Sequence, residues 1–166
     1  ANWKQYEGAW VSVPIGSSGK TIKNIGCLVT SISMLVAKSG QPTTITGDFN
    51  PGTFVQALNS NGGFTSNGSL IWSTVTKIVP SFKYQGFVSV SGLSKEAKLN
   101  KLKELLSNKN NYVVAEVKGN TGQHWVAIDG ISDGNIVMMD PGSPSSDLWA
   151  QYDWRNTTQF NYYTLG

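Results

Sequence analysis

The stretch NIGCLVTSISML, residues 24–35, contains the only cysteine of the chain, Cys27. Apolar residues follow the cysteine with the spacing of one helix face, which predicts a helix from Cys27 to about Ser39, ended by Gly40. A thiol at the start of a helix lies beside unpaired backbone N–H groups and the positive end of the helix dipole, and both favour the thiolate. The chain also contains a single histidine, His124. The central question is whether these two side chains meet.

The length and the cysteine content limit the class of protein. With 166 residues, the chain is expected to form one domain, residues 1–166, that buries a core without disulfides or metal. One cysteine excludes an internal disulfide, and one cysteine with one histidine exclude zinc sites built from several such residues. No apolar run reaches the roughly 18 residues of a membrane span. We therefore expect no metal, no cofactor and no transmembrane segment.

The charge pattern bears on partners and surroundings. The net charge of +3 comes almost wholly from lysine, since Arg155 is the only arginine. Proteins that read nucleic acids rely on arginine for bidentate contacts, so we expect no nucleic-acid partner. Only 14% of the residues are charged, while Trp, Tyr and Phe are plentiful. This composition is typical of secreted bacterial or phage proteins, and we expect an extracellular or cell-wall-associated monomer.

Helix patterns dominate the first two thirds of the chain and strand patterns the last third. Residues 1–26 show neither pattern and are expected to be irregular. Further helices are expected after the N-cap Asn50 with Pro51 behind it, over about 69–79, and from the N-cap Ser94 to about Leu106, with a solvated lysine-rich side. Strands are expected at 87–90, 112–117, 123–131 and 135–139, with one or two more in the aromatic tail. Helices followed by an antiparallel sheet indicate an α+β fold.

Three side chains could form a cysteine-dependent catalytic centre. A cysteine nucleophile needs an imidazole that stabilises the thiolate and later protonates the leaving group, and a third group that orients the imidazole. Cys27 is the candidate nucleophile, and His124, on the predicted strand 123–131, is the candidate base. Asp140 ends the next predicted strand and is the candidate orienting group. Asp129 is the alternative for that role.

The hairpin between the two strands tests whether Asp140 can reach His124. A two-residue turn at Asp133-Gly134 between regular strands would put the two side chains on opposite faces, because side chains alternate along a strand. A three-residue loop over 132–134, with Gly134 left-handed, or a β-bulge would bring them to one face. We therefore expect the longer loop or a bulge.

Several short motifs, taken in chain order, resemble the C39-like group of papain-fold cysteine peptidases. They are Lys4-Gln5-Tyr6 with Trp10, Gly26-Cys27 with Thr30-Ser31 and Met34, His124-Trp125-Val126, and Asp140-Pro141. The resemblance implies a papain-like fold, in which the cysteine helix packs on an antiparallel sheet that carries the histidine and the acid. It also implies that Gln5 and the backbone N–H of Cys27 form the oxyanion hole; Gln123 is a poorer candidate than Gln5.

The resemblance leads to a hypothesis about function. We expect a cysteine hydrolase that cleaves an amide bond through an acyl-thioester intermediate, acting on a bacterial cell-wall peptide as a peptidoglycan endopeptidase or amidase does. Family members that process leader peptides for exporters typically carry Asp before a Cys-Gly pair, and Gly26-Cys27-Leu28 differs from that pattern. Cleavage of a protein or leader peptide is therefore one alternative. A module of the same fold that binds without catalysis is the other.

Overall fold

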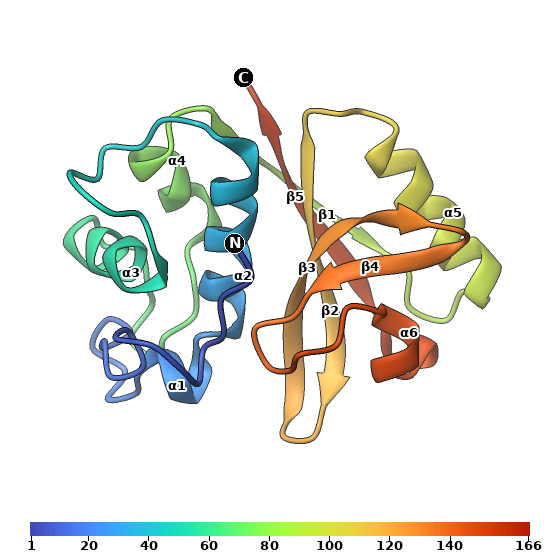
Figure 1. Ribbon diagram of the computed structural model, residues 1–166, viewed down its shortest axis with the longest axis horizontal. Helices are drawn as coiled ribbons and strands as arrows, with labels where there is room; N and C mark the ends of the chain where they lie inside the picture. The colour runs from blue at the N-terminus through green and yellow to red at the C-terminus, as the bar shows by residue number, and fades with distance from the viewer.

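The computed structural model describes residues 1–166 and combines helices with one antiparallel sheet (Figure 1). The helical elements are α1 (Ile22–Ile25), α2 (Cys27–Ser39), α3 (Pro51–Ser60), η1 (Trp72–Thr74), α4 (Val75–Ile78), α5 (Lys95–Leu106), α6 (Leu148–Gln151) and η2 (Trp154–Asn156). The strands are β1 (Phe82–Ser89), β2 (Asn111–Gly119), β3 (Gly122–Ser132), β4 (Asn135–Met139) and β5 (Gln159–Leu165). The predicted α+β fold class is confirmed, and α2, α3 and α5 lie where their sequence patterns predict them.

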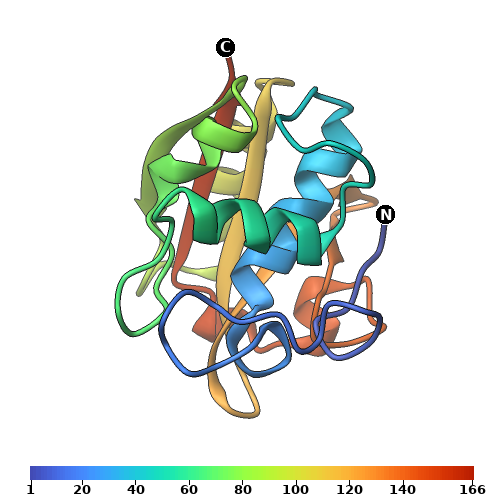
Figure 2. The same ribbon diagram turned by 90° about the vertical axis from the view of Figure 1, so that its left-hand side faces the viewer.

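The sheet separates two apolar cores. Its strand order is β1-β5-β2-β3-β4, and every neighbouring pair is antiparallel. α2 lies between one face of the sheet and α3, while α5 covers the other face (Figures 1 and 2). Side chains alternate along each strand, so that Val114 of β2 enters one core and Val113 the other. A core of 20 buried residues lies on the α2 face, and a core of 11 lies on the α5 face.

α2, which carries the cysteine, is fixed at both ends by glycine. Gly40 ends the helix in the left-handed conformation, with a φ of 66°. Gly26 precedes the helix, and a Cβ at this position would lie 2.4 Å from the carbonyl oxygen of Ile22. Only a residue without a side chain allows this close approach between α1 and α2. Residues 29–36 are all buried, which makes α2 central to the larger core.

Three predicted elements differ from the structure. The helix predicted over 69–79 is shorter, because Leu70 pairs with Phe64 in an isolated β-bridge and helical backbone begins at Trp72. The strand predicted at 87–90 begins earlier and forms β1, whereas the aromatic tail contributes one strand, β5, within the predicted one or two. Residues 1–26 contain the short helix α1 within otherwise irregular chain.

The prediction that the lysine-rich side of α5 faces solvent is wrong for Lys98. Its side chain is 1% exposed, and Nζ donates hydrogen bonds to three carbonyl oxygens, those of Trp154, Arg155 and Thr157. Burial lowers the pKa of Lys98, and the charge of Asp153 offsets part of that effect. The long aliphatic stem of lysine crosses the apolar layer and places the ammonium against the end of η2.

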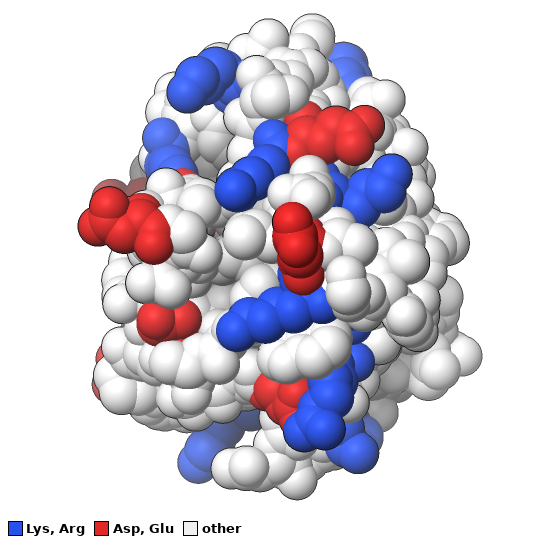
Figure 3. Space-filling model, turned by 90° about the vertical axis from the view of Figure 1, so that its right-hand side faces the viewer, with Lys and Arg blue, Asp and Glu red and all other residues white.

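The surface that carries α5 and α6 mixes charges of both signs. Figure 3 shows Lys and Arg side chains beside Asp and Glu over this face, separated by uncharged residues. This face therefore lacks the continuous basic surface that follows a nucleic-acid backbone. None of the helices combines the length and the apolar character needed to cross a bilayer.

Candidate active site

The turn between β3 and β4 is shorter than predicted. Ser132 pairs with Asn135, so the turn has only two residues, Asp133 and Gly134, and both have positive φ. Such a turn matches the twist of the flanking strands. The predicted three-residue loop is therefore wrong, and the turn alone does not bring Asp140 to the face of the histidine.

A β-bulge, which was predicted as the alternative to a longer loop, is present at Asp129. The pairing register of β3 with β4 shifts there, between Ile128 and Gly130. One extra residue in a strand reverses the face of every residue beyond it. Asp140, directly after β4, therefore shares a face of the sheet with His124.

His124 lies on a part of β3 that has a free edge. β4 pairs with β3 only from Ala127 toward the turn, so the residues before Ala127 have β2 on one side and no strand on the other. Cys27, the first residue of α2, lines the same cleft as His124. The structure thus brings together Cys27 from α2, His124 from β3 and Asp140 from the end of β4.

The carboxylate of Asp140 is fully buried and accepts hydrogen bonds at both oxygens. Oδ1 lies 2.8 Å from Nε2 of His124 and accepts from the backbone N–H of Gly142, also at 2.8 Å. Oδ2 accepts from the hydroxyl of Ser143 at 2.6 Å and from that of Tyr152 at 2.5 Å. Because an ionised carboxylate only accepts, Nε2 of His124 donates in this contact. Nδ1 is then the ring nitrogen that can act as a base.

These contacts determine the ionisation of His124 and Asp140. Burial alone would lower the pKa of His124, but hydrogen bonds to Asp140 and Cys27, together with their charges, raise it to about 9. Burial would raise the pKa of Asp140, but its four hydrogen bonds hold that pKa below the ordinary value. His124 is therefore an imidazolium near neutral pH, beside an ionised Asp140.

The imidazole is enclosed on several sides. A Cβ at Gly142 would lie 2.7 Å from Cε1 and 2.9 Å from Nε2 of His124, so this position tolerates no side chain without a shift of the ring. The ring of Tyr152 packs beside the imidazole, with the ring centroids 5.6 Å apart and an interplanar angle of 43°. With Asp140 bound to Nε2, His124 cannot turn without displacing one of these neighbours.

The N-terminal arm is fastened to the segment that follows β4. Nζ of Lys4 donates to the carbonyl oxygen of Asp140 at 2.7 Å, and the backbone N–H of Gln5 donates to that of Pro141 at 3.0 Å. Lys4 is 6% exposed. Its burial lowers its pKa, while the charges of Asp140 and Glu7 act in the opposite direction. The buried ammonium therefore holds Gln5 at the edge of the site.

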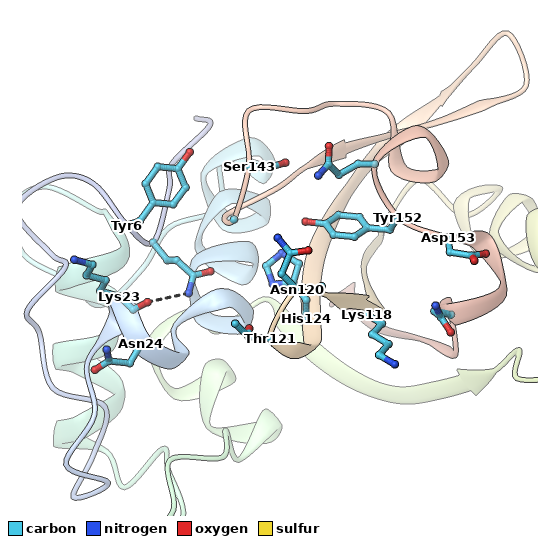
Figure 4. Close-up of a pocket in the computed structure, with 15 residues that line it drawn as sticks. Tyr6, Lys23, Asn24, Lys118, Asn120, Thr121, His124, Ser143, Tyr152 and Asp153 are labelled. Atoms are coloured by element: carbon cyan, nitrogen blue, oxygen red, sulfur yellow. Dashed lines mark hydrogen bonds between the residues drawn. The ribbon is translucent and has the colours of Figure 1, made fainter.

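Gln5 lines the cleft together with Cys27 and His124. Its Nε2 donates to the carbonyl oxygen of Lys23 at 3.3 Å (Figure 4). Its Oε1 is buried and has no hydrogen-bond partner. The carbonyl of Lys23 fixes the orientation of the amide, because Oε1 would be repelled at that position.

Two clefts meet beside His124. The first has a volume of about 570 Å³, and polar side chains from both halves of the molecule surround it (Figure 4). The second has a volume of about 560 Å³ and includes Cys27. Its apolar wall consists of Ile15, Ile25, Leu28, Val29, Phe64, Leu70, Trp72 and Trp125. The thiol thus borders the second cleft, while the imidazole borders both.

The weaker alternatives named from the sequence are engaged elsewhere. Asp129 forms an ion pair with Lys38 at 2.7 Å, at the bulge rather than beside the histidine. Gln123 lines the second cleft, but its amide donates to the carboxylate of Glu116. The geometry therefore favours Asp140 over Asp129 as the partner of the imidazole. Of the two glutamines, Gln5 is the one with a buried polar atom, Oε1, that has no hydrogen-bond partner.

Sequence reasoning missed three contributors to the site, namely Lys4, Ser143 and Tyr152. Asp140-Pro141-Gly142-Ser143 is a turn signature in which an Asp side chain binds groups two or three residues on, and this signal could have identified Ser143. Tyr152 carries no comparable local signal. It reaches Asp140 because α6 folds back toward the site.

Comparison with known proteins identifies the family. No curated protein matches the chain. A solved structure from Bacillus anthracis, itself provisionally described as a C39-like peptidase, has 16% sequence identity and a TM-score of 0.44, over 98% of this chain and 93% of that one. The model of the Peptidase_C39 like family matches residues 10–166, a range that includes Cys27, His124 and Asp140. The chain therefore belongs to the Peptidase_C39 like family.

Proposed function

We propose that this protein is a cysteine peptidase with Cys27 as its nucleophile. The proposal rests on one observation: the only histidine binds a buried, ionised Asp140 and borders the cleft that contains the only cysteine. Membership of a peptidase family supports the reaction class. Each of the three side chains then has a role that its surroundings favour.

In the proposed reaction, the Cys27 thiolate attacks the carbonyl carbon of the scissile amide and forms a tetrahedral intermediate. His124, an imidazolium at this point, gives its Nδ1 proton to the leaving nitrogen as the C–N bond breaks. The acyl group remains on Sγ as a thioester. His124 then removes a proton from a water molecule that attacks the thioester, which releases the acid and restores the thiolate–imidazolium pair. Asp140 keeps the other proton on Nε2 throughout.

The oxyanion of each intermediate would be stabilised by two donors. The backbone N–H of Cys27 is the first of α2 and has no partner within that helix. The amide of Gln5 has a second N–H besides the one that it gives to Lys23. Donors that are already oriented stabilise charge at little reorganisation cost. Gln5 is held in place by Lys4, so the arm would complete the site.

The two clefts suggest how a peptide substrate lies. The second cleft borders Cys27 and would receive the acyl part, which becomes bonded to Sγ. The first cleft borders His124 but not Cys27 and would receive the leaving amine, which His124 protonates. We propose a bacterial cell-wall peptide as the substrate class, supported by the largely polar lining of the leaving side, whose charged residues besides His124 are Lys23, Lys118 and Asp153, and by the composition. That substrate would place the protein outside the cell or at the wall.

The test is the release of new amino groups by wild type and Cys27→Ala from purified bacterial walls and, separately, from a peptide library. The proposal expects release by wild type and none by the variant, with equal melting temperatures. Full activity of Cys27→Ala would refute the cysteine mechanism. Cleavage of the library without release from walls would replace the wall substrate by processing of a protein or leader peptide.

Alkylation of the thiol, measured beside the cleavage test, separates catalysis from the alternative of a module that binds without catalysis. Because the chain has one cysteine, alkylation by iodoacetamide reports on Cys27 alone. A thiolate–imidazolium pair predicts faster alkylation near neutral pH than that of a free thiol. Alkylation no faster than a free thiol, with no cleavage of either substrate, would favour binding without catalysis.

A further inference from the structure

Two hydroxyl groups that take no part in the proposed reaction hold the acid of the site. The hydroxyl of Ser143 and that of Tyr152 both donate to Oδ2 of Asp140, at 2.6 Å and 2.5 Å. Oδ1, the other oxygen, lies against Nε2 of His124. Because both hydroxyl groups bind Oδ2, they fix the orientation of the carboxylate and therefore the direction in which Oδ1 points. They come from two separate segments, the turn after β4 and the residue that follows α6.

We infer that Ser143 and Tyr152 are positioning residues, which together hold the Asp140 carboxylate so that Oδ1 keeps a proton on Nε2 of His124. Neither hydroxyl has to touch the substrate or the thiol for this role. The predicted effect on kcat rests on the proposed function. The hydrogen bonds between these side chains do not depend on that function.

The charges around Asp140 explain why neutral donors suit this position. The titratable groups that face it are His124 from β3, Lys4 from the N-terminal arm and Tyr152 after α6, with Cys27 of α2 beyond the imidazole. Lys4 binds the main-chain carbonyl of Asp140, not its carboxylate. A cationic donor at Oδ2 would compete with the imidazolium for the charge. Hydroxyl groups satisfy Oδ2 without adding a second positive charge beside the carboxylate.

Tyr152 is suited to the role because it remains protonated. Burial and the hydrogen bond to Asp140 both raise the pKa of Tyr152 above its ordinary value, so the phenol stays a donor at any pH at which the protein works. Its ring also packs beside the imidazole of His124. Tyr152→Phe keeps that ring and removes only the hydroxyl, and Ser143→Ala likewise removes only a hydroxyl.

The single histidine makes the test direct, because the Nε2–H signal in an NMR spectrum comes from His124 alone. Hydrogen bonding to a buried carboxylate should slow the exchange of this proton and make it visible at neutral pH. We expect the signal in wild type, a weaker signal in each single variant, and none in Tyr152→Phe/Ser143→Ala. In the double variant kcat should fall by about tenfold or more and KM should change less than kcat, because the orientation of the imidazole acts on the chemical step.

A matched control is Tyr84→Phe, which removes a phenol hydrogen bond of 2.6 Å to Asn161 in another part of the sheet. This control should keep the Nε2–H signal and kcat. If the double variant also keeps both and only its melting temperature falls, the two hydroxyls are merely structural and the inference is overturned. If the double variant fails to fold, the two single variants decide in the same way. If the wild type cleaves no peptide, the proposed function fails, while the NMR signal still decides the positioning role.

Discussion

His124 and Asp140 are joined by a hydrogen bond of 2.8 Å between Nε2 and Oδ1, across a hairpin whose turn alone would keep them on opposite faces. The bulge at Asp129 removes this conflict by adding one residue to β3. Lys38 of α2 anchors the bulge, since its Nζ contacts both the carboxylate and the carbonyl oxygen of Asp129. One irregular residue far from the thiol thus decides whether the acid can reach the imidazole.

Deletion of Asp129 should therefore disconnect the acid from the histidine. Without the extra residue, the pairing register that the two-residue turn sets would continue along β3 and β4. Asp140 would then lie on the face of the sheet opposite His124. We expect kcat/KM to fall by about 100-fold or more, because the imidazole loses its orienting partner. The pKa of His124, measured by NMR, should fall from about 9 toward its ordinary value. Asp129→Asn is the control, since it removes the charge but keeps the bulge. A deletion variant that retains the high pKa would contradict this account.

Gly142→Ala tests how closely the segment after β4 packs on the imidazole. The new Cβ would lie 2.7 Å from Cε1 of His124, so the ring must move away from its position at Asp140. We expect kcat to fall by about tenfold or more with a small change in stability, because Gly142 itself is exposed. Gly130→Ala is the matched control, since a Cβ there meets nothing within 4 Å. Equal kcat in the two variants would show that the ring has room to adjust.

The parts of the site that could be predicted are those with a local pattern. Helical spacing after Cys27 and alternation around His124 are properties of short segments, and both elements formed where predicted. The need for a bulge or a longer loop also followed from strand geometry. The position of the bulge was not predicted, although Gly130, a glycine inside the predicted strand, is a residue typical of bulges.

The parts that could not be predicted depend on contacts between distant segments. A lysine in a helix pattern indicates a solvated face, yet Lys98 is buried because a segment 56 or more residues later brings three carbonyls to its ammonium. Tyr152 belongs to the aromatic tail, where only strands were predicted, and its hydroxyl reaches Asp140. Polar side chains of this kind find their partners only when the chain is folded, so a sequence pattern does not reveal them.

The stability of the protein should fall as the pH rises from about 7 toward 10, because His124 loses its proton. Its pKa is raised from 6.5 to about 9 in the folded state. The folded state therefore binds this proton more tightly than the unfolded state does. The associated stability is complete below pH 6.5 and is lost as the pH rises through about 9. A shift of this size corresponds to about 3 kcal/mol.

Urea unfolding at a series of pH values from 6 to 10 measures this dependence. Asp140→Asn removes the carboxylate that holds the imidazolium, so the free energy of unfolding of this variant should vary much less over the same range. Cys27→Ala should show an intermediate slope, because Asp140 remains. A slope that is the same in wild type and Asp140→Asn would assign the pH dependence to another group.

Lys98→Met should destabilise the protein strongly, although the replaced residue is a lysine on a helix. Methionine fills the same apolar channel but leaves the carbonyls of Arg155 and Thr157 without this donor, while the carbonyl of Trp154 still accepts from the backbone N–H of Thr157. We expect the free energy of unfolding to fall by about 2 kcal/mol, since each acceptor left without a partner costs about 1 kcal/mol or more. Lys101→Met on the exposed side of α5 is the control and should change that free energy by about 0.5 kcal/mol at most. Because η2 begins two residues after Tyr152, Lys98→Met should also weaken the Nε2–H signal of His124. A signal of wild-type strength would show that Tyr152 is held independently of η2.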